Sequence, residues 1–286
     1  LSSAGPPAVL PELSHRFLTF QSRRTSASPP ERSEHLNLFV SDFLTGRQWT
    51  LVEGESDDMN LSVSLVPRSR SSRGPGSRRR SRSLRAPELV AGWNRRNPNS
   101  FRLQGMGCRM NLRNGDCLDF VLSPEGSSHP VSAQGRLFWL VEQDDGNRSI
   151  YGCLPGPSNG RCDEYDLGLP PARRSGLDTD GESLFWIEFQ GGQRVGVCPL
   201  DPMTGACPAR ALTPVISPFS RVAVSGRLVA WVDFRFGRDK PLLLCEFDPQ
   251  TGGCPPIEIA PNVLDSTPQL SGNRLVWDGH VGDEAS

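Results

Sequence analysis

The chain of 286 residues has no run of about 18 apolar residues, which is the length that a membrane-spanning helix requires. No window repeats its apolar residues at the 3.6-residue spacing of an amphipathic helix over a helical length, so a helical fold is not expected. The sequence begins without a methionine or a recognisable signal peptide. We therefore expect a processed or trimmed mature form.

Sequence motifs of common catalytic and metal centres are also missing. There is no G-x-S-x-G elbow, no phosphate-binding loop and no H-x-H or H-E-x-x-H pair. His35, His129 and His280 each stand in a polar stretch, and we expect them in surface loops. The stretch 178–181 resembles part of a calcium-binding loop, but the remaining ligands are absent. The sequence predicts no catalytic residue, no metal site and no cofactor.

Lysine is almost absent, and the arginines are unevenly spread. Lys240 is the one lysine among 31 basic residues, and the formal net charge is −1. The segment 67–86 contains eight arginines and no acidic residue, and removing these eight from 31 leaves 23 basic against 32 acidic residues. The eight are Arg68, Arg70, Arg73, Arg78, Arg79, Arg80, Arg82 and Arg85.

This segment includes "RSRSSRGPGSRRRSRS", which has no apolar residue with which to pack a core. We therefore expect 67–86 to be a disordered Arg/Ser-rich insertion. A solvated insertion without a role of its own is the favoured interpretation. The alternative is an electrostatic arm for an anionic polymer, a lipid surface or an acidic protein. Nucleic acid is the least expected partner, because no aromatic residues alternate with the arginines to stack on bases.

All eight cysteines fall into four pairs with the same spacing of nine residues. In each pair a glycine precedes the second cysteine by two residues, where it can supply the positive φ of a hairpin turn. The pairs are Cys108 with Cys117, Cys153 with Cys162, Cys198 with Cys207, and Cys245 with Cys254.

Large aromatic residues repeat at a longer period. Five tryptophans follow one another at separations of 46, 47, 45 and 46 residues, and "PELSHRFLTF" lines up with "PQLSGNRLVW" to add a phenylalanine as the sixth member. In the first copy Phe39 and Gln48 stand at the cysteine positions, and the last copy stops soon after its tryptophan. We predict that the six aromatic residues anchor strands by packing; they are Phe20, Trp93, Trp139, Trp186, Trp231 and Trp277.

Each complete copy contains four short segments rich in β-branched and aromatic residues, separated by turn signals, such as "LLLCEF" and "CPPIEIA". A four-stranded unit of about 45 residues that recurs four to eight times is typical of a β-propeller. The sequence therefore predicts an all-β fold, with a single β-propeller domain over 1–286. We expect about six four-stranded blades, the last of them incomplete.

The fifth copy, "LVAWVDFRFGRDKPLLLCEFDPQTGG", resembles the TolB-type β-propeller repeat of bacterial and archaeal periplasmic and cell-surface proteins. The matching residues, complete in this copy alone, are Trp231, Asp233, Arg235, Gly237, Asp248, Thr251 and Gly252. The resemblance implies a propeller fold but no single function, because such repeats serve many purposes. Some TolB-like propellers are polysaccharide lyases with a histidine-lined metal centre, which makes a carbohydrate-active enzyme one alternative.

The spacing of the cysteines favours disulfides over zinc, because zinc sites usually group thiolates in C-x₂₋₄-C knuckles. Cysteines on either side of a hairpin turn can face each other at the distance that a disulfide requires. We predict local pairing in blades 2–5, with each bond stabilising its hairpin by about 2.5 kcal/mol in the chain-entropy model. Such bonds persist outside a reducing cytosol. We therefore expect an exported protein, in a periplasm, on the outer surface or secreted.

In the expected strand order, the connections between blades and the loops between second and third strands emerge on one face, and the stapled turns emerge on the other. We place 67–86 and the three histidines on the first face, with 67–86 between blades 1 and 2. The incomplete last blade leaves a sheet edge that a protein partner could cover by adding strands. The sequence predicts a non-enzymatic binding scaffold of a surface assembly, with a propeller lyase or a polyanion-binding protein as alternatives.

Overall fold

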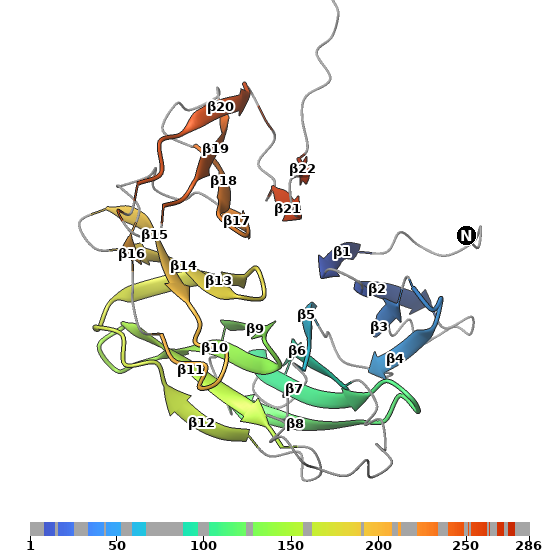
Figure 1. Cartoon of the computed structure of the whole chain (residues 1–286). Coiled ribbons are helices and arrows are strands. Elements are labelled where there is room, and N and C mark those ends of the chain that lie inside the picture. The colour runs from blue at the N-terminus through green and yellow to red at the C-terminus, as the bar shows by residue number, and fades with distance from the viewer. Residues whose placement is uncertain are drawn as a thin grey trace, which may run out of the picture.

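The computed structural model shows six antiparallel sheets arranged around a common axis (Figure 1). The residues that it describes are 9–14, 17–25, 34–42, 44–52, 59–66, 88–96, 103–123, 128–156, 162–189, 192–207, 211–212, 222–233, 240–248, 251, 253–261, 263, 268–271 and 274–277. In each sheet the strands follow one another in chain order, with the first strand nearest the axis. This confirms the predicted all-β propeller with four-stranded blades.

The strands of the six blades have the following bounds. Blades 1 and 2 contain β1 (Val9–Ser14), β2 (Phe17–Thr25), β3 (Glu34–Asp42), β4 (Gln48–Val52), β5 (Met59–Leu65), β6 (Glu88–Arg96), β7 (Leu103–Asn111) and β8 (Cys117–Ser123). Blades 3 and 4 contain β9 (Ser128–Ala133), β10 (Arg136–Glu142), β11 (Arg148–Pro155), β12 (Cys162–Asp166), β13 (Arg173–Thr179), β14 (Ser183–Phe189), β15 (Gln193–Pro199) and β16 (Ala211–Leu212). Blades 5 and 6 contain β17 (Val222–Ser225), β18 (Leu228–Val232), β19 (Leu242–Glu246), β20 (Ile257–Ala260), β21 (Gln269–Ser271) and β22 (Arg274–Val276).

The second strand of a complete blade is apolar on both faces because blades pack on both sides of it. In β14, "SLFWIEF", five successive residues are buried. The tryptophans of β6, β10, β14 and β18 are at most 3% exposed, namely Trp93, Trp139, Trp186 and Trp231. The side chain of the sixth repeat member in β2, Phe20, lies outside the described residues.

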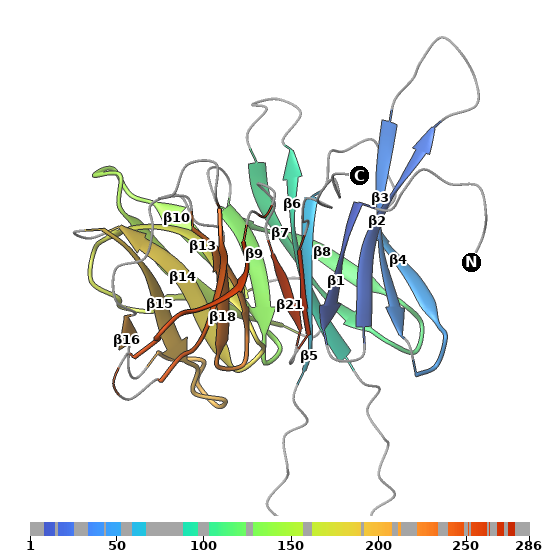
Figure 2. The same cartoon turned by 90° about the horizontal axis from the view of Figure 1, so that it is seen from above.

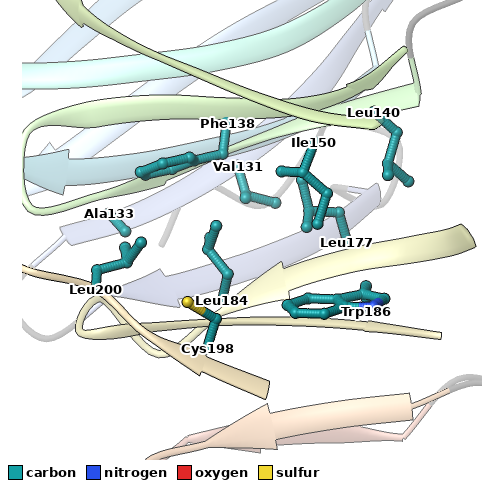
Figure 3. Packing of buried hydrophobic residues seen from close by; sticks show 10 residues of the cluster. All are labelled: Val131, Ala133, Phe138, Leu140, Ile150, Leu177, Leu184, Trp186, Cys198 and Leu200. Carbon is teal, nitrogen blue, oxygen red and sulfur yellow. The ribbon is translucent and has the colours of Figure 1, made fainter. Parts of the chain in front are cut away.

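Clusters of buried side chains join neighbouring blades, and one of them fills the space between blades 3 and 4 (Figure 3). Val131 and Phe138 from blade 3 meet Leu184, Trp186 and Cys198 from blade 4. Burial of apolar surface between blades is the main favourable contribution to folding. The core is therefore divided into a series of layers between blades.

The four predicted disulfides are present, one in each of blades 2–5. Each joins the third strand of its blade to the residue at or near the start of the fourth, with Cα separations of 5.7, 5.4, 5.6 and 5.2 Å in chain order. These separations are within the usual range for a disulfide. Four such bonds indicate an oxidising compartment.

The sequence predicts that the arginine-rich segment lies between blades 1 and 2, and the structure shows that this placement is wrong. Strand β5 precedes it and pairs with β6, which follows it, so the segment is an insertion within blade 2. Leu65 pairs with Leu89, Leu89 with Met110, and Met110 with Cys117. The flanks of the insertion therefore adjoin the stapled turn, on the face opposite to the one predicted. The residues of the insertion itself lie outside the described part of the chain.

Candidate functional site

The turns between third and fourth strands share one construction in blades 1 and 4. In blade 4 the Asp201 carboxylate accepts the N–H and hydroxyl of Thr204, while the Gly205 N–H donates to the Asp201 carbonyl over 2.7 Å. In blade 1 the Thr45 hydroxyl donates to Asp42 over 2.7 Å, and the Gly46 N–H donates to the Asp42 carbonyl over 2.8 Å. An Asp at this position replaces backbone interactions that the turn leaves unmade.

The glycine of this turn receives an aromatic side chain from the preceding blade. Gly115 of blade 2 has a φ of 82°, and an added Cβ there would lie 2.7 Å from Cδ1 of Trp49 on β4. Gly205 of blade 4 has a φ of 72° and contacts Tyr165 on β12, whose hydroxyl donates to the Gly205 carbonyl over 3.4 Å. Glycine is needed at both positions for its positive φ, and its missing Cβ leaves room for the Trp49 ring at Gly115 and for Arg136 and the Tyr165 hydroxyl at Gly205.

The same aromatic residues pack against the disulfides. Trp49 joins the buried cluster that contains Cys108, with Cys117 beside it, and Tyr165 joins the cluster of Cys198. Phe120 of blade 2 packs in the cluster of Cys153. Each of these contacts links the outer strand of one blade to the third and fourth strands of the next blade.

The turn of blade 1 has the shared backbone geometry but no aromatic neighbour among the described residues. Gly46 has a φ of 68°, and no atom lies within 4 Å of the position that a Cβ would take. Gln48 and Thr50, on the following strand, are exposed, whereas Trp49 and Leu51 point toward blade 2. Blade 1 therefore presents an open turn toward blade 6.

The sixth blade is represented by two described strands, and its second strand is exposed. Val276 is 65% exposed, whereas the equivalent residues before the tryptophan in blades 3–5 are at most 2% exposed, namely Phe138, Phe185 and Ala230. Trp277 is 37% exposed and belongs to no core cluster of the described residues. No described third strand covers Trp277, and its role as a blade anchor stays a prediction.

We call β22, Trp277 and the turn 42–48 the open junction. Blades 6 and 1 are neighbours around the axis (Figure 1), and no described strand pairs across from one to the other. Leu275 packs toward blade 5, beside Val232 and Leu242, so the opposite face of β22 is the one directed toward blade 1. An edge strand next to an apolar surface and an open turn can bind polypeptide through main-chain hydrogen bonds.

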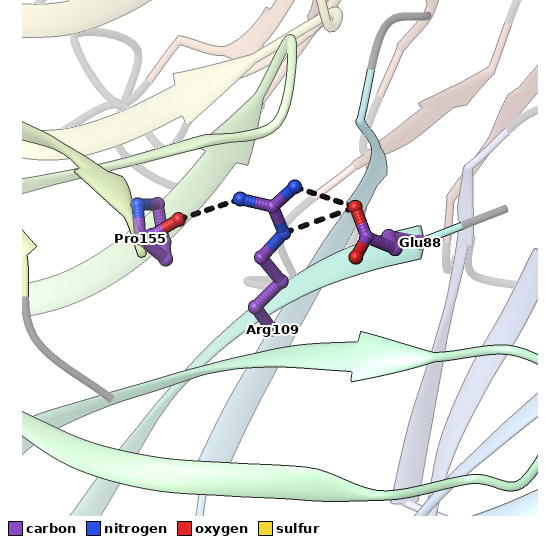
Figure 4. A network of polar contacts seen from close by, with 3 residues as sticks. All are labelled: Glu88, Arg109 and Pro155. Atoms are coloured by element: carbon purple, nitrogen blue, oxygen red, sulfur yellow. Dashed lines mark hydrogen bonds and ion pairs between the residues drawn. The ribbon is translucent and has the colours of Figure 1, made fainter. Parts of the chain in front are cut away.

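Polar side chains fasten complete blades to one another elsewhere. The Arg109 guanidinium donates to the Pro155 carbonyl of blade 3 over 2.9 Å and to Glu88 over 2.5 Å (Figure 4). Arg136 of blade 3 donates to the Met203 carbonyl in the turn of blade 4 over 2.5 Å. These arginines have partners within the ring and are not arranged as a binding cluster.

The inner strands carry a second kind of inter-blade contact. Ser62 on β5 accepts the Ser132 N–H of the next blade over 3.0 Å. Asp178 stands at the equivalent position of β13 and accepts the Val224 N–H of blade 5 as well as the Thr179 N–H over 2.8 Å. Burial raises the pKa of Asp178 to about 6. The carboxyl group has a structural partner, so its raised pKa alone does not indicate catalysis.

Other residues singled out in the sequence are not gathered at one place. His35 lies in β3 and His129 in β9, so the expectation that these histidines occupy loops is wrong, while His280 lies outside the described residues. The eight arginines of 67–86 also lie outside them. Within the described ranges, no group of three or more His, Cys, Asp or Glu residues could hold a metal ion. No helix within these ranges is long and apolar enough to cross a membrane.

Comparisons with known proteins support the fold. The structure is similar to that of the acylaminoacyl peptidase of Pyrococcus horikoshii, with a TM-score of 0.52 and 13% identity over 94% of this chain and 41% of that one. It is also similar to the β-propeller domain of the trilobed protease from Pyrococcus furiosus, described as having an open velcro topology, with a TM-score of 0.53 and 12% identity over 92% of this chain and 74% of that one. The chain thus spans less than half the length of the peptidase. No protein-family model and no curated protein sequence matches it.

Proposed function

We propose that this propeller is a non-enzymatic binding scaffold, which joins a protein partner within an assembly of the periplasm, the outer surface or the secreted fraction. The observation that supports this most is the open junction, where an apolar strand that is buried in other blades is exposed beside an unoccupied turn. The four disulfides support an oxidising compartment. The TolB-type repeat of the fifth blade supports the placement in or outside a bacterial or archaeal envelope.

The similar archaeal structures include proteases, and the trilobed protease propeller is described as open. At 12% and 13% identity these likenesses concern the fold. The described residues contain no group of three or more His, Cys, Asp or Glu side chains that could hold a metal ion. A binding role is therefore the better-supported proposal, and a propeller lyase is the alternative.

Photo-crosslinking in the cells that produce the protein tests the proposal. A photo-reactive residue replaces Val276 in one variant and Ile257, on the outer strand of blade 5, in the other; the two side chains are 65% and 59% exposed. We expect a discrete adduct with one protein at Val276 and none at Ile257. An adduct at Ile257 alone would move the binding surface away from the junction. The absence of any adduct, together with cleavage of a polysaccharide by the purified chain, would replace the scaffold with the enzyme.

A further inference from the structure

The repeat itself shows what a complete junction between two blades contains. At the junctions of blades 1 with 2 and 3 with 4, the outer strand of one blade places an aromatic ring on the turn glycine of the next. These contacts join Trp49 to Gly115 and Tyr165 to Gly205. At Gly115 the Trp49 ring fills the space that a Cβ would need, and at Gly205 the Tyr165 hydroxyl fills it together with the Arg136 side chain of the same blade. A junction is therefore complete when an outer strand is present to supply such a ring.

The turn of blade 1 has the same backbone conformation as the glycine turns of blades 2 and 4 that accept a side chain from the preceding blade. Gly46 has the left-handed φ of Gly115 and Gly205, and its N–H makes the same hydrogen bond to the carbonyl four residues earlier. The Asp42 N–H donates to the Arg47 carbonyl over 2.8 Å, as the Asp201 N–H does to Ala206 over 3.0 Å. The turn is thus already folded in the receiving conformation, although no described atom approaches the Gly46 side that would take the ring.

The strand β22 is a second strand that pairs with no described third strand. In blades 3–5 the second strand pairs with a third strand along its whole length, for example Trp139 with Tyr151 and Trp231 with Leu243. Among the described residues β22 pairs with β21 alone. Val276 is exposed on the face that the next blade covers elsewhere, whereas Trp277 is exposed on the opposite face, which packs against the preceding blade in blades 2–5. Among the described residues, blade 6 therefore shows neither a third nor a fourth strand at this junction.

We propose that the partner occupies the open junction with a β-hairpin, an inference that rests on the proposed scaffold function and specifies the partner's binding element. The first strand of the hairpin pairs antiparallel with β22, as third strands pair with second strands in the other blades. Its second strand then lies outermost and directs an aromatic side chain onto Gly46. The first strand of the hairpin is apolar at successive positions because both of its faces become buried between blades 5 and 1.

A synthetic peptide with the sequence of residues 34–52 of this chain is a suitable probe. It contains the third and fourth strands of blade 1, it has no cysteine, and its Trp49 already packs on a turn glycine in the folded protein. Titrated into the full chain with its disulfides intact, the labelled peptide should bind one to one by fluorescence anisotropy. Hydrogen exchange should then slow at residues 269–277 and 42–48.

Paired variants locate the binding site. Gly46→Ala should weaken binding about fivefold by placing a Cβ where the ring sits, whereas Gly226→Ala should not, although Gly226 also has a positive φ of 59° and open space around it. Val276→Asp should weaken binding about tenfold through an unpaired charge at the strand edge, whereas Ile257→Asp should leave it unchanged. A peptide with alanine in place of Trp49 should also lose about tenfold.

Several results would overturn the inference. The peptide could fail to bind at about 1 mM, or it could slow hydrogen exchange at a sheet edge other than β22. It could also bind by displacing the protein's own β3–β4 hairpin. Finally, the chain could form a dimer in which hydrogen exchange at β22 is already slow without peptide. An adduct at Val276 without peptide binding would leave the scaffold function standing and refute the hairpin. If neither the adduct nor peptide binding is observed, the scaffold function and the hairpin inference are both refuted.

Discussion

Asp178 is a single side chain whose environment sets a pH dependence. Burial is the largest cause of its raised pKa, and the nearby Asp180 carboxylate adds to the effect, while the Thr179 and Val224 N–H groups oppose it. Because the folded-state pKa of about 6 exceeds the usual value of 3.8, the folded protein binds this proton more tightly than the unfolded chain. The resulting stability is fully present below about pH 4 and is lost as the pH rises through 6.

We therefore expect Asp178→Asn to stabilise the protein at alkaline pH, since asparagine can accept the same N–H groups without a buried charge. The gain in unfolding free energy should be about 1–2 kcal/mol at pH 8 and much smaller at pH 4.5. Urea unfolding at the two pH values measures it. The exposed Asp145, whose pKa is lowered by its hydrogen bonds to Asn147, is the control, and Asp145→Asn should produce no gain at pH 8. Equal gains at both pH values for Asp178→Asn would contradict the linkage.

Two turn glycines allow the free-energy cost of a strained backbone to be separated from the cost of displacing a neighbouring side chain. Gly115→Ala places a Cβ both in a left-handed conformation and against Trp49, whereas Gly226→Ala incurs the conformational cost alone. The conformational cost is about 1–2 kcal/mol. We expect Gly115→Ala to lower the unfolding free energy by about 1–3 kcal/mol more than Gly226→Ala, because displacement of the ring adds a packing cost. Urea denaturation of the two variants gives this difference, and equal losses would show that the ring moves freely.

The hairpins of blades 2–5 each combine a stapled turn with a contact to the preceding blade. We expect reduction to loosen these hairpins, since each bond contributes about 2.5 kcal/mol in the chain-entropy model. Hydrogen exchange under reducing conditions should show faster exchange at β19 and β20 than in the oxidised protein. The β3–β4 hairpin, which has Phe39 and Gln48 at the corresponding positions, should keep its protection. Equal loosening of both hairpins would mean that the disulfides act on the ring as a whole.

The hairpins were the elements most accessible to prediction from the sequence. Identical cysteine spacing, the glycine before the second cysteine and the tryptophan period together predict four strands per unit and local disulfides. The first strand of blade 2 was missed because the insertion separates "NLSVSL" from its partner strand, although its alternation of apolar and polar residues is a strand signal. That error placed 67–86 on the wrong face.

The contacts between neighbouring blades were less accessible, because no sequence pattern states which blade a side chain faces. Trp49, Phe120 and Tyr165 follow their cysteine positions by one or three residues. This odd offset places them on the face of the strand opposite to the cysteine. The signal was present, but it acquires meaning only once the packing order of the blades is known.

The arginine-rich insertion affects the charge of the whole molecule. Removing residues 68–85 takes eight positive charges from a net charge of −1 and leaves −9. We expect the complete protein to be retained on heparin at low salt and the deletion variant to pass through, because the eight clustered arginines attract the polyanion. The retention should fall steeply as salt is added, because such binding is driven by counterion release. The unfolding free energy should change little, since β5 and β6 pair on both sides of the deletion. Retention that survives the deletion would assign the anion binding to the ring.

A ring whose described strands do not pair between the first and last blades should unravel from its ends. Blades 3 and 4 are packed on both sides, whereas blade 6 has two described strands, of which β22 rests on blade 5 through Leu275. In arrays where each unit contacts only its neighbours, terminal units open at lower free energy than internal ones. Native-state hydrogen exchange should therefore show the lowest protection at β21 and β22, intermediate protection in blade 1 and the highest in β10 and β14. Binding of the hairpin peptide should raise the protection of both ends together, because it bridges the two terminal blades. Uniform protection in the free protein would show instead that the ring opens as one cooperative unit.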